Sequence, residues 1–234
     1  MKRRIKISII TNSVLALLII AVLCVSMLPQ AVVPSYSNSI IKPIYNGNRA
    51  NKKVSLMFNV YENTSIVEQI MNELDKRQLK ATFFIGGCWA DDNGEMLVKL
   101  VSNGHEIANH GYFHKDHKKL SYEQNHQEIR LTGAIIKALC GVQTTLFAPP
   151  SGSFSNLTLS CAEDLGYKVI LWSRDTIDWR DKDVNLIVKR ATNVTNGDLI
   201  LMHPKEHTLK ALPQILDYFE KVGLEQVKVS QNII

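Results

Sequence analysis

The stretch VSLMFNVYENTSIVEQIMNELDKRQLKATFFI, residues 54–85, decides the fold. Two short apolar runs rich in β-branched and aromatic residues, Val54–Asn59 and Ala81–Ile85, predict strands. Between them, Ser65 and Glu68 have the spacing of a capping box, and the apolar residues that follow recur at helical intervals. The stretch therefore predicts a strand, a helix and a second strand.

The same alternation continues to the end of the chain. Further strands are predicted at Glu106–Asn109, Thr145–Ala148, Lys168–Trp172, Asp198–His203 and Gln226–Ser230. Helices are predicted after Asp91 up to Gly104, from Ser121 with Gln124 up to Gly141, and before Gly166, Gly197 and Gly223. Seven strands that alternate with helices predict an α/β fold with parallel strands, either an open sheet or a closed barrel.

The N-terminus has the pattern of a membrane anchor. Four basic residues between positions 2 and 6 precede an uncharged apolar run, Ile7–Leu28, which is long enough to span a bilayer. Because basic residues stay on the cytoplasmic side, we expect a single-pass protein with its C-terminal domain outside the cytoplasm. A cleaved signal peptide is the alternative. We therefore divide the chain into an anchor or uncleaved signal (1–28), a stalk (29–53) and an outer domain (54–234).

Charge and cysteine content narrow the function classes. Of the formal net charge of +5, the N-terminal basic residues supply four, so 23 basic and 22 acidic residues remain beyond position 28. The outer domain lacks the clustered positive charge that nucleic-acid binding requires. Cys88, Cys140 and Cys161 have no metal-ligand spacing, and a bridge between Cys140 and Cys161 stays open.

Residues with chemical function directly follow the predicted strands. In parallel α/β folds these strand ends form the face that carries active sites. His110 and His114, four residues apart, suit a divalent metal if a rigid turn holds them on one face. The other interpretation is a pair of solvated loop histidines, and only the structural context can decide between the two.

Several stretches resemble the NodB-type polysaccharide deacetylase family, carbohydrate esterase family 4, most closely its sporulation-associated branch. The resemblance extends from Val54 to about Val229 and rests on residues 81–89, 104–114, 166–179 and 197–203. It implies a deformed (β/α) barrel of about seven parallel strands. It also implies metal-dependent removal of N-acetyl groups from amino sugars of cell-wall glycan such as peptidoglycan.

By this resemblance, each motif residue receives a role. His110 and His114 would bind a divalent metal, zinc or similar, and His203 would be the general acid with Asp175 as its orienting partner. The substrate-binding residues would be Trp179 and Leu201, as walls of an acetyl-methyl pocket, with Pro149 and Pro150.

The first motif departs from the family. The family pattern Thr-Phe-Asp-Asp supplies a base and a metal ligand, but this chain has Asn59 and Val60 at those two positions. An amide has no useful basicity and valine offers no lone pair, so metal binding is expected to be weak. Ala148 replaces the arginine that would hold the base, and the loss is consistent, since an arginine without its carboxylate partner is an uncompensated charge.

Glu62 is a candidate substitute for the missing base, although a solvated residue ahead of a helix is the simpler interpretation. His117 is expected to be a plain surface histidine, and His207 a loop histidine. Three functions stay open: a deacetylase with a remodelled base, a catalytically weak or inactive protein that binds glycan in the cell envelope or spore, and a hydrolase of another ester or amide. The fold alone does not choose among them.

Overall fold

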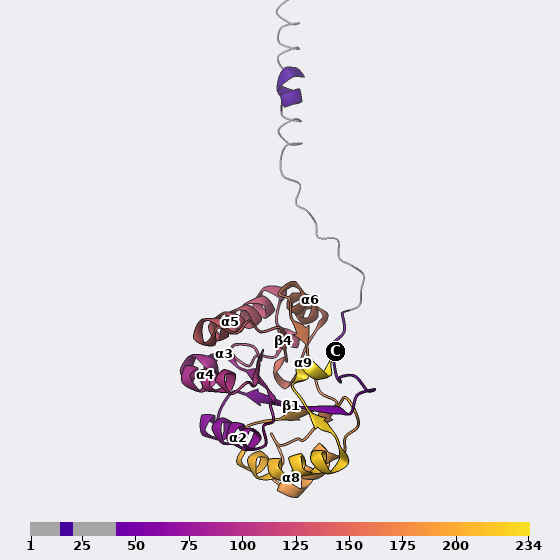
Figure 1. The fold of residues 1–234 in the computed structure, drawn as a ribbon. Helices are drawn as coiled ribbons and strands as arrows, with labels where there is room; N and C mark the ends of the chain where they lie inside the picture. Colours follow the sequence, from indigo (N-terminus) through magenta and orange to yellow (C-terminus); the bar gives the residue numbers. More distant parts are fainter. Residues whose placement is uncertain (1–14, 21–40) are drawn as a thin grey trace, which may run out of the picture. The chain divides into compact units, whose positions relative to one another are not determined.

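The computed structural model describes residues 15–20 and 41–234 (Figure 1). Most of the predicted anchor, Ile7–Leu28, lies outside these residues, as does the stalk up to position 40. No helix within the described residues is long and apolar enough to cross a membrane. Residues 41–234 form one compact unit, to which the rest of this description applies.

A parallel sheet forms the centre of this unit. Seven of its strands follow the order β5-β4-β3-β2-β1-β7-β6, and β8 pairs with the start of β1. Every described ladder is parallel. The strands are β1 (Lys53–Val60), β2 (Thr82–Ile85), β3 (Glu106–Asn109), β4 (Leu146–Phe147), β5 (Lys168–Val169), β6 (Arg174–Asp175), β7 (Leu199–Met202) and β8 (Glu225–Gln226). The predicted α/β class with about seven parallel strands is confirmed, and the predicted deformed barrel is a deformed half-barrel.

Two strands differ from the sequence prediction. β6 was not predicted, because two residues are too few to show a period, and only the pairing of Arg174 with Ile200 and of Asp175 with Leu201 defines it. The predicted strand Gln226–Ser230 is wrong beyond Gln226. There the chain turns into the short helix α9 (Val229–Asn232).

Helices surround the sheet on its outer side (Figure 1). They are α2 (Thr64–Lys76), α3 (Gly87–Asp92), α4 (Gly94–Ser102), α5 (Tyr122–Cys140), α6 (Asn156–Asp164), α7 (Val184–Thr192) and α8 (Glu206–Val222). The capping box of Ser121 with Gln124 is confirmed at the start of α5. The box predicted for Ser65 is wrong, because α2 begins at Thr64 after Asn63, whose left-handed backbone leaves no side-chain cap.

Strand β1 separates two apolar layers. Leu56, Phe58 and Val60 are fully buried in the layer between the sheet and the helices. Met57 belongs to the smaller layer inside the half-barrel, and Asn59 follows it on the same face because side chains alternate along a strand. This alternation directs Asn59 towards the inside of the half-barrel and Val60 into the outer core.

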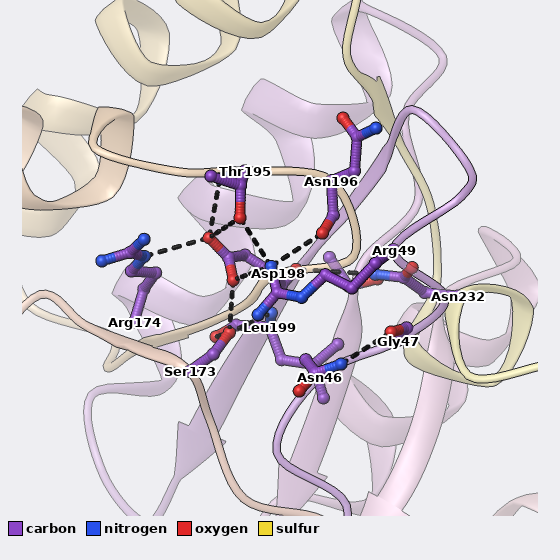
Figure 2. A network of polar contacts seen from close by, with 11 residues as sticks. Asn46, Gly47, Arg49, Ser173, Arg174, Thr195, Asn196, Asp198, Leu199 and Asn232 are labelled. Atoms are coloured by element: carbon purple, nitrogen blue, oxygen red, sulfur yellow. Dashed lines mark hydrogen bonds and ion pairs between the residues drawn. The ribbon is translucent and has the colours of Figure 1, made fainter.

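The segment before β1 is part of the folded unit, which corrects the predicted stalk boundary. Ile44 pairs with Ile170 beyond β5, and Asn46 forms a bridge with Asp198 at the start of β7. The fully buried carboxylate of Asp198 accepts hydrogen bonds from Arg49 at 2.7 Å and from Arg174 at 3.0 Å (Figure 2). Residues 41–49 therefore connect the end of the edge strand β5 with the start of β7 instead of serving as a spacer.

Candidate functional site

A pocket of about 740 Å³ opens at the carboxyl ends of the strands. It brings together eight residues predicted from the sequence: Asn59, Glu62, His110, His114, Asp175, Trp179, Leu201 and His203. Five lining residues were not predicted, namely Tyr61, Ser151, Trp172, Pro204 and Lys205. Pro149 and Pro150 do not line it. They introduce the single-turn helix η2 (Pro150–Gly152), and Pro150 is buried, so substrate binding by the two prolines stays a prediction.

The sheet register sets the order of the side chains across the pocket floor. Phe58 pairs with Met202, so the next residues, Asn59 and His203, end neighbouring strands. On the other side of β1, Val60 pairs with Ile85, and Ile85 pairs with Asn109, which precedes His110. Asn59 therefore lies between the strand end that carries His110 and the one that carries His203.

His203 is oriented by Asp178, which corrects the role predicted for Asp175. The Oδ1 atom of Asp178 is 2.7 Å from Nδ1 of His203, and its Oδ2 atom accepts the His203 amide at 2.7 Å and the Thr208 hydroxyl at 2.6 Å. A carboxylate can only accept, so Nδ1 carries the proton and Nε2 is left for the pocket. Asp178 is 1% exposed, which makes this dyad a rigid part of the site.

Asp175 has a different position. It lines the pocket and accepts the Ile177 amide at 2.7 Å. Ile177 has a φ of 55°, a left-handed conformation that costs a β-branched residue roughly 1–3 kcal/mol. This turn directs Asp178 inwards.

His110 and His114 lie together with ring centroids 5.5 Å apart. Nδ1 of His110 donates to the Ala148 carbonyl at 2.7 Å, and burial lowers the pKa of His110 to about 3, so its ring is neutral. Burial also lowers the pKa of His114. The two lie in a tight loop with left-handed residues at Gly111 and His114, not in a helix.

Tyr61 connects this loop to β1. Its hydroxyl accepts the His114 amide at 2.7 Å and lies within hydrogen-bond distance of the Gly111 and Tyr112 carbonyls. A Cβ at Gly86 would lie 2.2 Å from the Tyr61 ring, so a glycine is required there. Burial raises the pKa of Tyr61, which keeps the hydroxyl protonated as a donor. No pattern in the sequence marked Tyr61.

The proposed substitute base is already paired. The Glu62 carboxylate, on the loop after β1, forms an ion pair with the Lys205 ammonium, on the loop after β7. Both residues line the pocket, and the Glu62 side chain is 55% exposed. This contact holds the carboxylate at the rim and reduces its availability for proton transfer.

The donor set does not fit a metal site of the family type. Among the described residues, no group of three His, Cys, Asp or Glu side chains is placed to hold a metal ion. His110 and His114 have no third ligand of this kind beside them among the described residues, whereas zinc sites ordinarily have at least three nitrogen, sulfur or carboxylate ligands. Val60 is fully buried in the outer core, away from the pocket. Metal binding by this chain stays a prediction.

Comparison with known proteins identifies the family. Residues 46–170 match the profile of the family described as polysaccharide deacetylase. The chain belongs to the polysaccharide deacetylase family. The matched residues include the stretches 81–89 and 104–114 and the departures at Asn59 and Ala148.

Three relatives are informative. The uncharacterized protein YlxY of Bacillus subtilis is 34% identical over 183 residues, which are 78% of this chain and 57% of YlxY. The peptidoglycan-N-acetylmuramic acid deacetylase PdaC of Bacillus subtilis is 31% identical over 77% of this chain and 38% of PdaC. The chain thus spans about half or less of the length of these relatives. They do not bear on the sporulation-associated branch, which stays a prediction.

The solved structure of BA3943 from Bacillus anthracis is similar with a TM-score of 0.81 and 30% identity, over 83% of this chain and 69% of BA3943. That protein is a CE4 family pseudoenzyme. A BA3943 mutant with restored enzymatic activity has also been solved, with the same TM-score and 29% identity. The similarity to BA3943 makes the state of the pocket, rather than the fold, the decisive question for this chain.

Proposed function

We propose that the pocket binds N-acetylated cell-wall glycan, such as peptidoglycan, and that it removes the acetyl group slowly or not at all. The observation that carries the proposal is the combination on the pocket floor of an intact His203–Asp178 dyad with a neutral amide at Asn59. Binding groups are present, and the residue that would accept a proton from water is absent.

The remaining side chains suit an acetamide-bearing sugar. Leu201 is 2% exposed and gives the pocket an apolar wall for a methyl group, and the exposed ring of Trp179 provides a flat surface at the rim. Nε2 of His203, positioned by Asp178, lies where a polar atom of the ligand would meet it. The similarity to PdaC, which acts on peptidoglycan, and to the pseudoenzyme BA3943 supports both parts of the proposal.

A weak deacetylase is the second candidate, and the retained dyad favours it. His203 can still protonate a leaving amine, but the attacking water lacks a positioned base, and such a base contributes roughly 100-fold to 10,000-fold in rate. The pairing of Glu62 with Lys205 speaks against Glu62 as a full replacement. The expected location outside the cytoplasm agrees with a glycan ligand and is part of the proposal.

Two measurements on the purified full chain test this function. Co-sedimentation with insoluble peptidoglycan measures binding, and acetate release from the same material measures hydrolysis, with PdaC as the active reference. We expect binding, little acetate, and weaker binding for Trp179→Ala. Leu157→Ala is the matched control, because Leu157 is similarly exposed on α6 and does not line the pocket. Absence of binding, or acetate release as fast as that of PdaC, would overturn the proposal.

A further inference from the structure

We infer that Asn59 is the residue that recognises the N-acetyl group, so that the position of the family's base has become a neutral hydrogen-bonding site. The inference rests on the proposed function, since it specifies which chemical group of the glycan the pocket selects. It concerns selection between an acetamide and a free amine, which the proposed function leaves open.

The Asn59 amide has no hydrogen-bond partner although it is buried. Four asparagines are buried among the described residues, and each of the other three, Asn109, Asn125 and Asn232, makes at least one side-chain hydrogen bond. Asn59 is 5% exposed and makes none, and its Oδ1 atom is buried without a partner. A buried polar group without a partner is costly, and native structures seldom keep one without a reason.

The comparison with Asn109 is close because both asparagines are at or near the ends of parallel strands of one sheet. Asn109 donates from Nδ2 to the Ile129 carbonyl at 2.7 Å and accepts the Gly111 amide at 2.9 Å. Its two bonds hold the loop that follows β3. Asn59 holds nothing in the described residues and instead lines the pocket. The missing partner of Asn59 is therefore expected to come from a ligand.

The position of Asn59 suits an acetamide. The register places it between the strand ends that carry His110 and His203. Leu201, two residues before His203 on β7, supplies an apolar wall beside it. A planar acetamide between the two imidazoles would meet Asn59 at the floor and could direct its methyl group to Leu201.

The chemistry distinguishes an amide from the carboxylate that the family has at this position. The neutral His110 ring donates through Nδ1 to Ala148, so its Nε2 can only accept. A ligand carbonyl needs a donor, which Nδ2 of Asn59 provides. A carboxylate would accept the N–H but repel the carbonyl oxygen, and it would attract the ammonium of a deacetylated sugar.

Isothermal titration of the full chain tests this inference with two soluble probes. One is the β-1,4-linked tetramer of N-acetylglucosamine, and the other is the glucosamine tetramer of the same length. We expect the wild type to prefer the acetylated tetramer, and Asn59→Leu, which has a similar branched shape without hydrogen bonding, to reduce this preference by about tenfold. Asn59→Asp should shift the preference towards the free amine. Acetate is monitored throughout, so that hydrolysis is not mistaken for weak binding.

Thermal unfolding separates recognition from a structural role. Asn59→Leu removes an amide without a partner, so its melting temperature should be equal to that of the wild type or higher. Asn125→Leu is the matched control, because Asn125 is buried and fully bonded on α5 away from the pocket. It should melt lower and keep the acetyl preference.

The outcomes are distinguishable. If the wild type binds neither tetramer, the proposed function fails and the inference fails with it. If the wild type binds both tetramers equally, or if Asn59→Leu keeps the full acetyl preference, glycan binding stands and the role of Asn59 is wrong. A lower melting temperature of Asn59→Leu, with unchanged preference, would show that the residue is only structural.

Discussion

A carboxylate should be tolerated at position 59 and not at position 60, although the family pattern has aspartate at both. The perturbation is the pair of single variants Asn59→Asp and Val60→Asp. Asn59 lines the pocket, whereas Val60 is fully buried among apolar residues of β1, β2 and the helices. The two side chains point to opposite faces of one strand.

The expected loss of stability differs between the two variants because the surroundings of the two side chains differ. Val60→Asp removes a buried valine, worth roughly 1.5–3 kcal/mol. It also places an ionised carboxylate in the core, at an effective cost of several kcal/mol. A total of about 5 kcal/mol would remove much or all of a stability margin of roughly 5–15 kcal/mol. Asn59→Asp exchanges an amide for a carboxylate at a position that lines the pocket, and we expect a smaller loss of stability than for Val60→Asp.

Urea unfolding with a metal chelator measures the change in stability of each variant, and urea unfolding with Zn²⁺ measures any stabilisation by the metal. Asn59→Asp adds a third ligand to His110 and His114, so zinc at about 100 times its Kd should stabilise this variant by roughly 2.7 kcal/mol. Val60→Asp should gain no such stabilisation. Val60→Asn, a neutral side chain of the same size, separates the cost of charge from the loss of apolar contacts. If Val60→Asp unfolds within 1 kcal/mol of the wild type and responds to zinc, residue 60 reaches the pocket and our assignment of the strand faces is wrong.

Three further predictions concern stability. Asp178→Asn should lower the free energy of unfolding by about 3 kcal/mol, because it breaks several charge-assisted hydrogen bonds, whereas Asp175→Asn should lower it by under about 1 kcal/mol. Equal losses for the two variants in urea unfolding would contradict the pairing of His203 with Asp178. Arg49→Ala should lower the free energy of unfolding by about 1 kcal/mol, since Asp198 keeps its other partners. No change would show that the contact between Arg49 and Asp198 does not contribute to stability. Burial lowers the pKa of His105 to about 4, below its value near 6.5 in the unfolded chain. The unfolded state therefore binds the proton first as the pH falls, and the free energy of unfolding should decrease by roughly 3 kcal/mol between pH 7 and pH 4. His105→Gln should flatten that slope in unfolding curves measured across the range, and an unchanged slope would assign it to other groups.

The sequence predicted parallel strands alternating with helices, because its strands are apolar runs separated by helices of regular period. It could not predict β6, whose two residues are defined only by pairing with β7. It also placed the wrong aspartate beside His203, because the choice between Asp175 and Asp178 depends on the left-handed turn at Ile177. A bulky β-branched residue gives no local sign of such a conformation. Tertiary contacts, not local sequence propensity, determine both the strand β6 and the aspartate that pairs with His203.

The departures from the family pattern are consistent with one another in the structure. Without an aspartate at position 59, no partner would neutralise an arginine at position 148, and Ala148 is instead fully buried inside the half-barrel while its carbonyl holds the ring of His110. Val60 likewise completes the outer core. Each replacement removes a buried charge that would otherwise need a partner. The His203–Asp178 dyad keeps its carboxylate, because Asp178 is fully bonded within the fold. The pocket therefore lacks the groups that depend on the missing base and metal ligand, and it has those that the fold supports by itself, which agrees with the proposed binding of glycan without efficient hydrolysis.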